Sequence, residues 1–245
     1  MNHKERITIA KALTKKIVRK YGKDIYGIVI YGSVAKNEDR RYSDLEMYVV
    51  TKKKLKVKEV KYVYRGMNIE VSYIPAREML RNAKTISLNW PIATDFYRSY
   101  LILYEKGDWF QKLRRAVASQ NPRDFKRAIQ KYLVWFYELM AKIKNAYRYK
   151  DNYSFLWLAA FLGWESIIFL GLVNRKYYKS ERDVFTSVMN FPIRPKNYQR
   201  LLETVCHFSV KDKKKIYHAT LKLFAELQWI ARERGISVEE NKLFV

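Results

Sequence analysis

The sequence predicts an α+β fold, in which a mixed sheet with flanking helices is followed by a C-terminal helical bundle. Up to residue 107, several short segments alternate apolar and polar residues, which is the two-residue period of strands. After Gly107-Asp108 the apolar residues recur at helical spacing over longer segments. The sequence shows no internal repeat and no long linker between the two parts.

The first part begins with an amphipathic, basic segment from Met1 to Lys20, in which Ile7, Ile9, Leu13 and Ile17 recur at near-helical spacing and predict a helix. A second helix is expected at 75–83. Five strands are expected, at 25–31, 44–50, 58–64, 67–74 and 100–104. This mixture is typical of a small mixed sheet with helices packed on one face.

The second part predicts helices only, at 122–147, at 153–173, after Ser180, from Asn197 and at 211–234, with Gly235 as a stop signal. The segment Phe155–Val173 is almost continuously apolar and approaches the length of a membrane span. Glu165 lies in its middle, where a charge is costly in lipid. We therefore predict a buried helix at the centre of the bundle and no membrane span. The sequence leaves open whether Glu165 faces a substrate or pairs with a buried base.

The chain has 245 residues and a formal net charge of +25, with dense basic runs at 52–58 and 211–215. Such a charge normally indicates a polyanionic partner, and RNA is one candidate. Charge runs are also often simply solvated. The single Cys206 excludes an intramolecular disulfide, and no N-terminal apolar segment indicates export, so we expect a cytoplasmic protein.

One motif carries most of the chemical information. Gly32-Ser33 is followed, after ten residues, by Asp44-Leu45-Glu46, and a strand-like run lies on each side. The spacing of two puts Asp44 and Glu46 on the same face of a strand. Paired carboxylates repel each other unless a cation lies between them, and Mg²⁺ with nucleotide phosphate is the natural choice. A Gly-Ser turn allows close approach of an anion. Each feature alone is common in turns and solvated edges, but their order and spacing together predict a nucleotidyl-transferring site.

A third carboxylate, Glu70, lies in the alternating run from Gly66 to Ile74. Its neighbours Ile69 and Val71 point to the other face of this predicted strand. Glu70 could therefore complete an acidic cluster with Asp44 and Glu46. Taken alone, it would be an ordinary surface residue.

These residues, with several others, resemble the kanamycin nucleotidyltransferase family of the polymerase-beta-like nucleotidyltransferase superfamily. The landmarks run through most of the chain: Tyr31-Gly32-Ser33, Tyr42 to Met47, Ile69-Glu70-Val71, Trp90-Pro91, Glu138 with Lys142 and Asn145, Gln228-Trp229 and Arg232 to Gly235. The resemblance implies a nucleotidyltransferase catalytic domain at 1–107 and a helical substrate-binding and dimerisation domain at 108–245. It also implies a homodimer with the site at the subunit interface.

Carried over by resemblance, Asp44 and Glu46 bind the metal and take part in catalysis, and Glu70 is the third acidic ligand. Gly32 and Ser33 contact the nucleotide phosphates. Lys36 stands where the family commonly has arginine, so the positive charge is kept while the bidentate geometry is lost. The implied cofactor is Mg²⁺, and the implied donor is ATP or another NTP.

The helical part supplies the remaining residues of the resemblance. Glu138 matches the general base, Lys142 a lysine on the nucleotide phosphates, and Ser180 a phosphate-contacting hydroxyl. Without the resemblance, Glu138 and Lys142 are an ordinary i,i+4 surface pair. The family match and the adjacent aromatic run Trp135-Phe136-Tyr137 favour the catalytic interpretation.

The function expected on these grounds is Mg²⁺-dependent transfer of NMP, expected to be AMP from ATP, to a hydroxyl of a small molecule. The acceptor is open, because aminoglycosides are polycations and Val134 stands where the resembling enzyme carries an acid. One alternative is a nucleotidyltransferase acting on RNA or protein, of the toxin–antitoxin or RNA-modification type. Another is a non-catalytic nucleic-acid-binding protein on the same scaffold.

Overall fold

The computed structural model describes residues 1–239, and these form two compact units. Unit 1 comprises Met1–Thr85 and Ala93–Asn121, and unit 2 comprises Ile86–Ile92 and the described residues from Pro122 onward. Unit 1 contains the sheet and unit 2 is entirely helical, which confirms the predicted α+β class. The sequence boundary expected at residue 107 falls inside unit 1, just before a helix that packs on the sheet.

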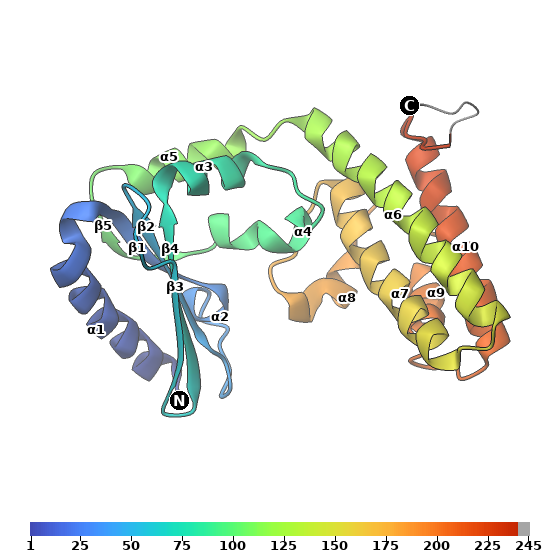
Figure 1. Ribbon diagram of the computed structural model, residues 1–245, viewed down its shortest axis with the longest axis horizontal. Helices are drawn as coiled ribbons and strands as arrows, with labels where there is room; N and C mark the ends of the chain where they lie inside the picture. The colour runs from blue at the N-terminus through green and yellow to red at the C-terminus, as the bar shows by residue number, and fades with distance from the viewer. Residues whose placement is uncertain (240–245) are drawn as a thin grey trace. The chain divides into compact units, whose positions relative to one another are not determined.

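The sheet of unit 1 has five strands in the order β3-β4-β2-β1-β5 (Figure 1). Strands β2 and β4 run parallel, and all other neighbours run antiparallel, so the sheet is mixed as expected. The strand bounds are β1 Ile25–Tyr31, β2 Leu45–Thr51, β3 Glu59–Tyr64, β4 Met67–Pro75 and β5 Leu101–Glu105. Every strand predicted from the alternation of the sequence is therefore present.

Helices cover both faces of this sheet. Helix α1 (His3–Tyr21), which begins with a capping box of Asn2 and Glu5, packs on one face. Helices α3 (Ala76–Lys84) and α5 (Trp109–Ala118) pack on the other. The expectation of helices on one face only was wrong, because β1 is apolar on both sides. Its alternate residues serve two separate cores, and α5 itself was not expected from the sequence.

Two short helices and two 3₁₀ turns complete the connections: α2 (Gly32–Ala35), α4 (Trp90–Ala93), η1 (Gly22–Asp24) and η2 (Asp95–Tyr97). The segment after β1, expected as a loop, is the helical turn α2. It leads into the connection that ends at β2.

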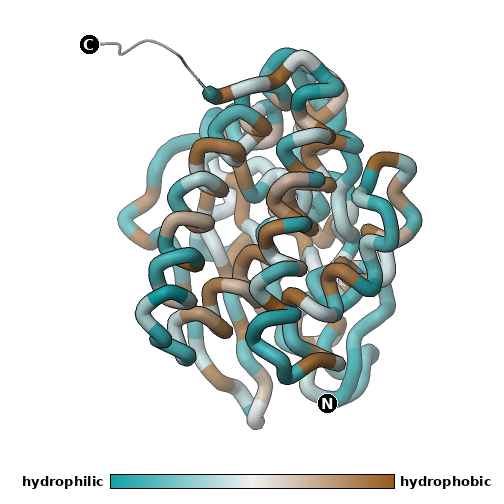
Figure 2. Tube along the Cα trace, turned by 90° about the vertical axis from the view of Figure 1, so that its right-hand side faces the viewer, coloured by the Kyte–Doolittle hydropathy of each residue, from teal (hydrophilic) through white to brown (hydrophobic). Residues whose placement is uncertain are grey.

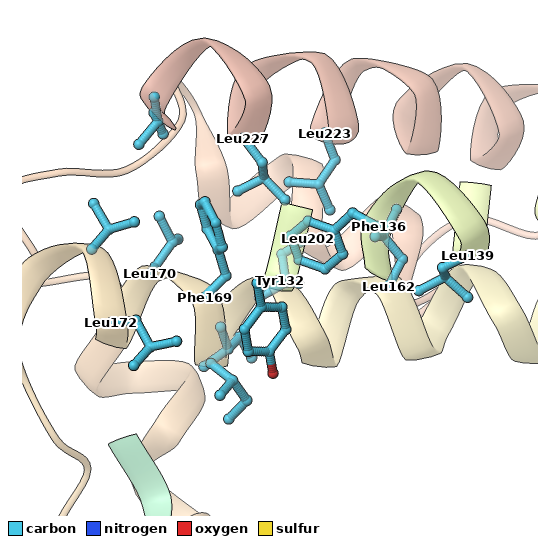
Figure 3. Packing of buried hydrophobic residues seen from close by; sticks show 14 of the residues in the cluster. Tyr132, Phe136, Leu139, Leu162, Phe169, Leu170, Leu172, Leu202, Leu223 and Leu227 are labelled. Atoms are coloured by element: carbon cyan, nitrogen blue, oxygen red, sulfur yellow. The ribbon is translucent and has the colours of Figure 1, made fainter. Parts of the chain in front are cut away.

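Unit 2 is a bundle built around three long helices, α6 (Pro122–Arg148), α7 (Asn152–Asn174) and α10 (Lys213–Arg232). The shorter α8 (Val184–Val188), which follows the 3₁₀ turn η3 (Glu181–Asp183), and α9 (Tyr198–Val205) pack against α7. Figure 3 shows Leu223 and Leu227 of α10 directed toward Phe169 of α7 and Leu202 of α9. Polar and apolar stretches alternate along the helices in Figure 2, as expected when one side of each helix enters a core.

Among residues 1–239, α7 is the one helix long and apolar enough to cross a membrane, and 61% of its most apolar window is buried inside the structure. It packs against α6, α8, α9 and α10, as a core helix does. The carboxyl of Glu165, in the middle of α7, accepts a 2.8 Å hydrogen bond from the buried hydroxyl of Tyr132. Burial raises the pKa of Glu165. Its partner is thus a phenol and not a base.

Candidate active site

A row of polar side chains crosses four neighbouring strands of unit 1. Tyr31 on β1 is opposite Glu46 on β2, and Glu46 is opposite Glu70 on β4. Glu70 in turn is opposite Lys61 on β3. Neighbouring strands lie about 4.8 Å apart, so the pairing register brings the two glutamates side by side.

The alternation of β2 explains why Glu46 faces this row. Leu45, Met47 and Val49 are completely buried in the core beneath α1. Glu46 therefore lies on the opposite face, as the sequence predicted. Asp44 immediately precedes the strand and is exposed. The motif thus presents two carboxylates at the start of β2.

The electrostatics of the row are those of crowded negative charge. Burial, the charge of Asp44 and the charge of Glu70 raise the pKa of Glu46 from its ordinary 4.5 to about 7. A hydrogen bond from Tyr31 and the positive charge of Lys36 act in the opposite direction. A carboxyl group that keeps its proton up to neutral pH lacks enough positive charge or hydrogen-bond donors nearby to stabilise its ionised form. A divalent cation would supply that compensation.

Gly32 is required by the position of Glu46. Its φ of +69° lies in the left-handed region, where side chains are strained. A Cβ built on Gly32 would lie 2.2 Å from Oε2 of Glu46, so the carboxylate of Glu46 would have to move away. The glycine of the Gly-Ser pair therefore makes room for a carboxylate of the group Asp44, Glu46 and Glu70, which we call the acidic row. Ser33 follows it in the helical turn α2.

Glu70 has partners for both of its carboxylate oxygens. One oxygen lies 3.1 Å from Nζ of Lys61, and the other accepts a 3.3 Å hydrogen bond from Ser72. Within residues 1–239, no group of three His, Cys, Asp or Glu side chains is arranged to hold a metal ion. The role of Glu70 as a third ligand therefore stays a prediction.

The donor set of the row fits Mg²⁺ through Asp44 and Glu46. Mg²⁺ prefers oxygen ligands and is commonly bound by one or two carboxylates together with substrate phosphates and water. Burial first, and then repulsion by the carboxylates of Asp44 and Glu70, raise the pKa of Glu46. A two-carboxylate site completed by nucleotide phosphates is consistent with this arrangement.

Lys36 is held by an acid that the sequence analysis did not single out. Its Nζ lies 2.8 Å from Oδ2 of Asp95, and both side chains are largely buried. Asp95 is fixed in turn by the Ser99 hydroxyl at 3.0 Å. The lysine is therefore positioned near Glu46, but its charge is already shared with a carboxylate.

An aromatic wall borders the same row. The rings of Tyr31 and Tyr48 stack with centroids 4.5 Å apart, and Phe96 stacks on Tyr48 at 5.0 Å. Burial, Tyr48 and Glu46 together raise the pKa of Tyr31, so its hydroxyl stays protonated as a donor. Tyr31 lies opposite Glu46 and Tyr48 lies two residues after it on β2, so the wall flanks Glu46.

The connection that carries Asp44 is fixed by Arg6 of α1. The Arg6 guanidinium pairs with Asp39 at 2.8 Å, and each side chain is 1% exposed. It also donates to the backbone carbonyls of Arg40, Arg41 and Ser43 at 2.9–3.1 Å. Ser43 is the residue directly before Asp44. The first helix thus anchors the segment on which the acidic motif depends.

The predicted residues of the helical part belong to unit 2. Glu138 and Lys142 form a 2.6 Å ion pair on α6, and their side chains are 58% and 52% exposed. The Lys142 ammonium also lies over the Trp135 ring, 5.4 Å from its centroid. Ser180 caps η3 by accepting from the Arg182 amide. Glu138 and Lys142 thus have the geometry of a surface pair, and their catalytic roles stay predictions.

Three residues with clear roles around the row were missed from the sequence: Arg6, Lys61 and Asp95. Arg6 lies on the buried stripe of α1 with Ala10, and an arginine in such a stripe is a signal of a buried ion pair. Lys61 could have been recognised only from the register of β3 against β4. Asp95 carried no local signal.

Comparison with known proteins identifies the class. The family model described as KNTase C-terminal domain matches residues 107–237, more than half of the chain. An aminoglycoside nucleotidyltransferase (4') of Staphylococcus aureus is 24% identical over 244 residues, which is 99% of this chain and 96% of that protein. A protein of the same name from a Bacillus species matches equally.

A solved structure agrees in fold. The nucleotidyltransferase-like protein from Exiguobacterium sibiricum has a TM-score of 0.59 and 11% sequence identity, and the match covers 91% of this chain and 75% of that one. At this identity the likeness concerns the fold. The family model, which matches more than half of the chain, shows that the chain belongs to the KNTase family, the kanamycin nucleotidyltransferases, and is a nucleotidyltransferase.

Proposed function

We propose that this enzyme transfers NMP from an NTP, with ATP as the expected donor, to a hydroxyl group of a small molecule. The observation that carries the proposal is the acidic row, in which the carboxylate of Glu46 presses against Gly32 beside Asp44 and Glu70. Such crowding of acids destabilises the protein alone. It becomes favourable when a metal-bound nucleotide is present.

In the proposed reaction Asp44 and Glu46 hold the divalent ion, and Gly32, Ser33 and Lys36 contact the nucleotide phosphates. A bound Mg²⁺ would neutralise charge on the phosphates and orient the α-phosphate for in-line attack. For Lys36 to bind phosphate, its 2.8 Å pair with Asp95 must loosen or be shared. Lys142 and Ser180 are the further phosphate contacts of the proposal.

Glu138 is the proposed general base. It takes the proton of the acceptor hydroxyl, the hydroxyl oxygen forms a bond to the α-phosphorus, and the bond to pyrophosphate breaks. Because Glu138 is exposed and already paired with Lys142, it can exchange that partner for a substrate. We propose that it serves the acidic row of a second subunit in a cytoplasmic homodimer.

The acceptor class is proposed from the relatives, whose names specify aminoglycosides. Two features of this chain weigh against a tight complex with a polycation: the net charge of +25, and Val134, which is 59% exposed. An apolar residue offers a cationic sugar no counter-charge. We therefore expect a less cationic acceptor to be used better than the most basic aminoglycosides.

The test is pyrophosphate release by the purified protein with Mg²⁺ and each NTP, with and without a panel of aminoglycosides graded by charge. Asp44→Ala should abolish release. The control is Glu78→Ala, which removes an exposed acid from α3 of the same unit. Acceptor-dependent release that survives in the control and disappears in Asp44→Ala supports the proposal. NTP turnover that no small hydroxyl acceptor stimulates would direct the assignment to RNA or protein acceptors.

The shared site has its own test. Asp44→Ala and Glu138→Gln should each be inactive, but mixed subunits should regain about a quarter of the parental activity, because half of the sites in half of the dimers are intact. The mixture must be unfolded and refolded together to exchange subunits. No recovery, with dimers demonstrated, would place both residues in one subunit's site or in none.

A further inference from the structure

A second site candidate lies in unit 2, where the connection between α6 and α7 meets the start of α10. A cavity of about 630 Å³ is found there, and we call it the basic cavity. Its lining contains five cationic side chains and one acid: Tyr147, Arg148, Lys150, Asn152, Phe155, Lys211, Asp212, Lys213 and Lys214. None of the residues proposed for nucleotidyl transfer lines it.

The positive charge of the basic cavity exceeds its internal counter-charge, which is the single Asp212. Within residues 1–239, none of the five cations is in an ion pair. The one acid, Asp212, caps α10 by accepting from the amides of Lys214 and Lys215. Like charges gathered around one cavity repel one another, and the repulsion is relieved by a bound anion. The geometry therefore points to an anionic ligand.

The arrangement also costs helix stability. The first turn of α10 contains lysines and no acid, so only the N-cap Asp212 meets the preference of the helix dipole for negative charge at that end. Helix α1 has the favourable order, with Glu5 in the first turn and basic residues in the last. A cluster that works against the helix it sits on is explained more readily by binding than by folding.

Exposed aromatic rings accompany the cations. Tyr149 and Lys150 lie in the α6–α7 connection, directly after Arg148, and Tyr153 lies in the first turn of α7. The two tyrosines are 76% and 91% exposed. At the wall of the cavity Tyr147 stacks on Tyr217 with centroids 3.9 Å apart and nearly parallel planes. Cationic grooves that follow the phosphates, with aromatic rings on which bases stack, are the usual means of binding single-stranded nucleic acid. A lipid surface would instead require an apolar helix face beside the lysines.

We propose that the basic cavity binds single-stranded nucleic acid, with backbone phosphates in the cavity and bases stacked on Tyr149 and Tyr153. The inference goes beyond nucleotidyl transfer to a small molecule and does not depend on the acidic row. It assigns a function to the lysine run 211–215, one part of the unexplained charge of the chain.

The experiment measures binding of a fluorescently labelled 12-nucleotide single-stranded RNA by anisotropy across a range of salt concentrations. The test variant is Lys213→Glu/Lys214→Glu. The matched control is Lys54→Glu/Lys56→Glu, which changes the net charge equally at another exposed basic run. We expect the test variant to weaken binding at least tenfold and to lower the salt slope by about 1.4, since each single-strand phosphate contact contributes about 0.7. The control should weaken binding less than threefold.

Stacking is tested by Tyr153→Ala against Phe208→Ala, which removes another exposed ring of unit 2. Tyr153→Ala should weaken RNA binding about fivefold or more without changing the salt slope, because stacking is not electrostatic. Folding of the charge variant is checked by thermal melting, and glutamates in the first turn of α10 should leave its Tm unchanged or raise it.

Three results would overturn the proposal. If the two double variants weaken RNA binding equally, RNA binds through the net charge of the protein and not through the basic cavity. Full competition by inorganic tripolyphosphate, with Tyr153→Ala unchanged, would assign the cavity to a phosphate ligand and not to nucleic acid. Binding to phosphatidylserine vesicles with no binding to RNA would assign it to a membrane surface. Pyrophosphate release should be unaltered in Lys213→Glu/Lys214→Glu, which separates this inference from the proposed reaction.

Discussion

Replacing Arg6 by methionine should destabilise the protein and also impair the acidic motif that Arg6 does not touch. The change keeps an unbranched apolar stem in the buried stripe of α1 but removes the charge that pairs with Asp39. Breaking a buried pair by removing one partner costs about 3–5 kcal/mol, because the other charge is left uncompensated. Nδ1 of His3 remains 2.6 Å from Oδ1 of Asp39 and keeps one hydrogen-bond partner for that carboxylate. We therefore expect about 3 kcal/mol of lost stability, the lower end of that range.

The loss is measured as the free energy of unfolding in urea. Arg6→Met/Asp39→Asn should recover part of it, because the second change removes the uncompensated charge. Arg19→Met is the control, since it removes an exposed arginine from the same helix and should cost less than about 0.5 kcal/mol. The reasoning is refuted if Arg6→Met costs no more than the control, or if the double variant is as unstable as the single one.

The same variant tests the positioning of Asp44. At a temperature where Arg6→Met is fully folded, kcat should fall and the Mg²⁺ concentration for half-maximal activity should rise, while KM for the acceptor should change little. For each of these constants Arg6→Lys should lie between the parent and Arg6→Met. Lysine restores the positive charge but cannot donate to the carbonyls of Arg40, Arg41 and Ser43 at once, as the guanidinium does. Equal fractional loss of every kinetic constant would indicate loss of folded enzyme only.

Three further outcomes are expected. Gly32→Ala should lower the free energy of unfolding, measured in urea, by about 2 kcal/mol, because alanine is strained in the left-handed conformation of this residue. It should also abolish pyrophosphate release, because the added Cβ displaces the carboxylate of Glu46. In the metal-free protein the pKa of Glu46 is about 7 in the folded state and 4.5 in the unfolded state, so the folded state binds the proton more tightly. The free energy of unfolding should therefore fall as the pH rises from 4.5 to 7, by at most about 3 kcal/mol and by less after solvent screening. Glu46→Gln should remove this pH dependence. Lys61→Met should free the Glu70 carboxylate and lower the Mg²⁺ requirement severalfold if Glu70 is a ligand, whereas an unchanged requirement would exclude that role.

Much of the fold could be predicted because its signals are local. The alternation from Leu45 to Val49 specifies which side chains of β2 enter the core, and the same two-residue period puts Glu46 on the opposite face. Helices α6 and α10 follow from an apolar period of about 3.6 residues, whereas α7 follows from a long and almost continuously apolar run. Helix α5 was not expected, although its apolar side is as buried as that of the others.

Two catalytic expectations depended on likeness and not on local pattern. Glu138 and Lys142 are four residues apart on α6, and their 2.6 Å pair is what that spacing alone would produce. A catalytic role depends on what approaches them, which their own helix does not encode. For the same reason the surface pair and the general base look identical in the sequence.

The sequence by itself determined the strands, the long helices and the presence of a carboxylate pair beside a Gly-Ser turn, because each depends on neighbours within a few residues. Tertiary structure alone decided that Glu70 lies opposite Glu46, that Lys61 occupies its carboxylate, and that Arg6 reaches across to Asp39. These contacts join residues from separate elements, and the register of two strands is fixed by the packing of both against a common core. The physical reason is that side-chain direction is set locally, whereas the partner in that direction is set by the whole fold.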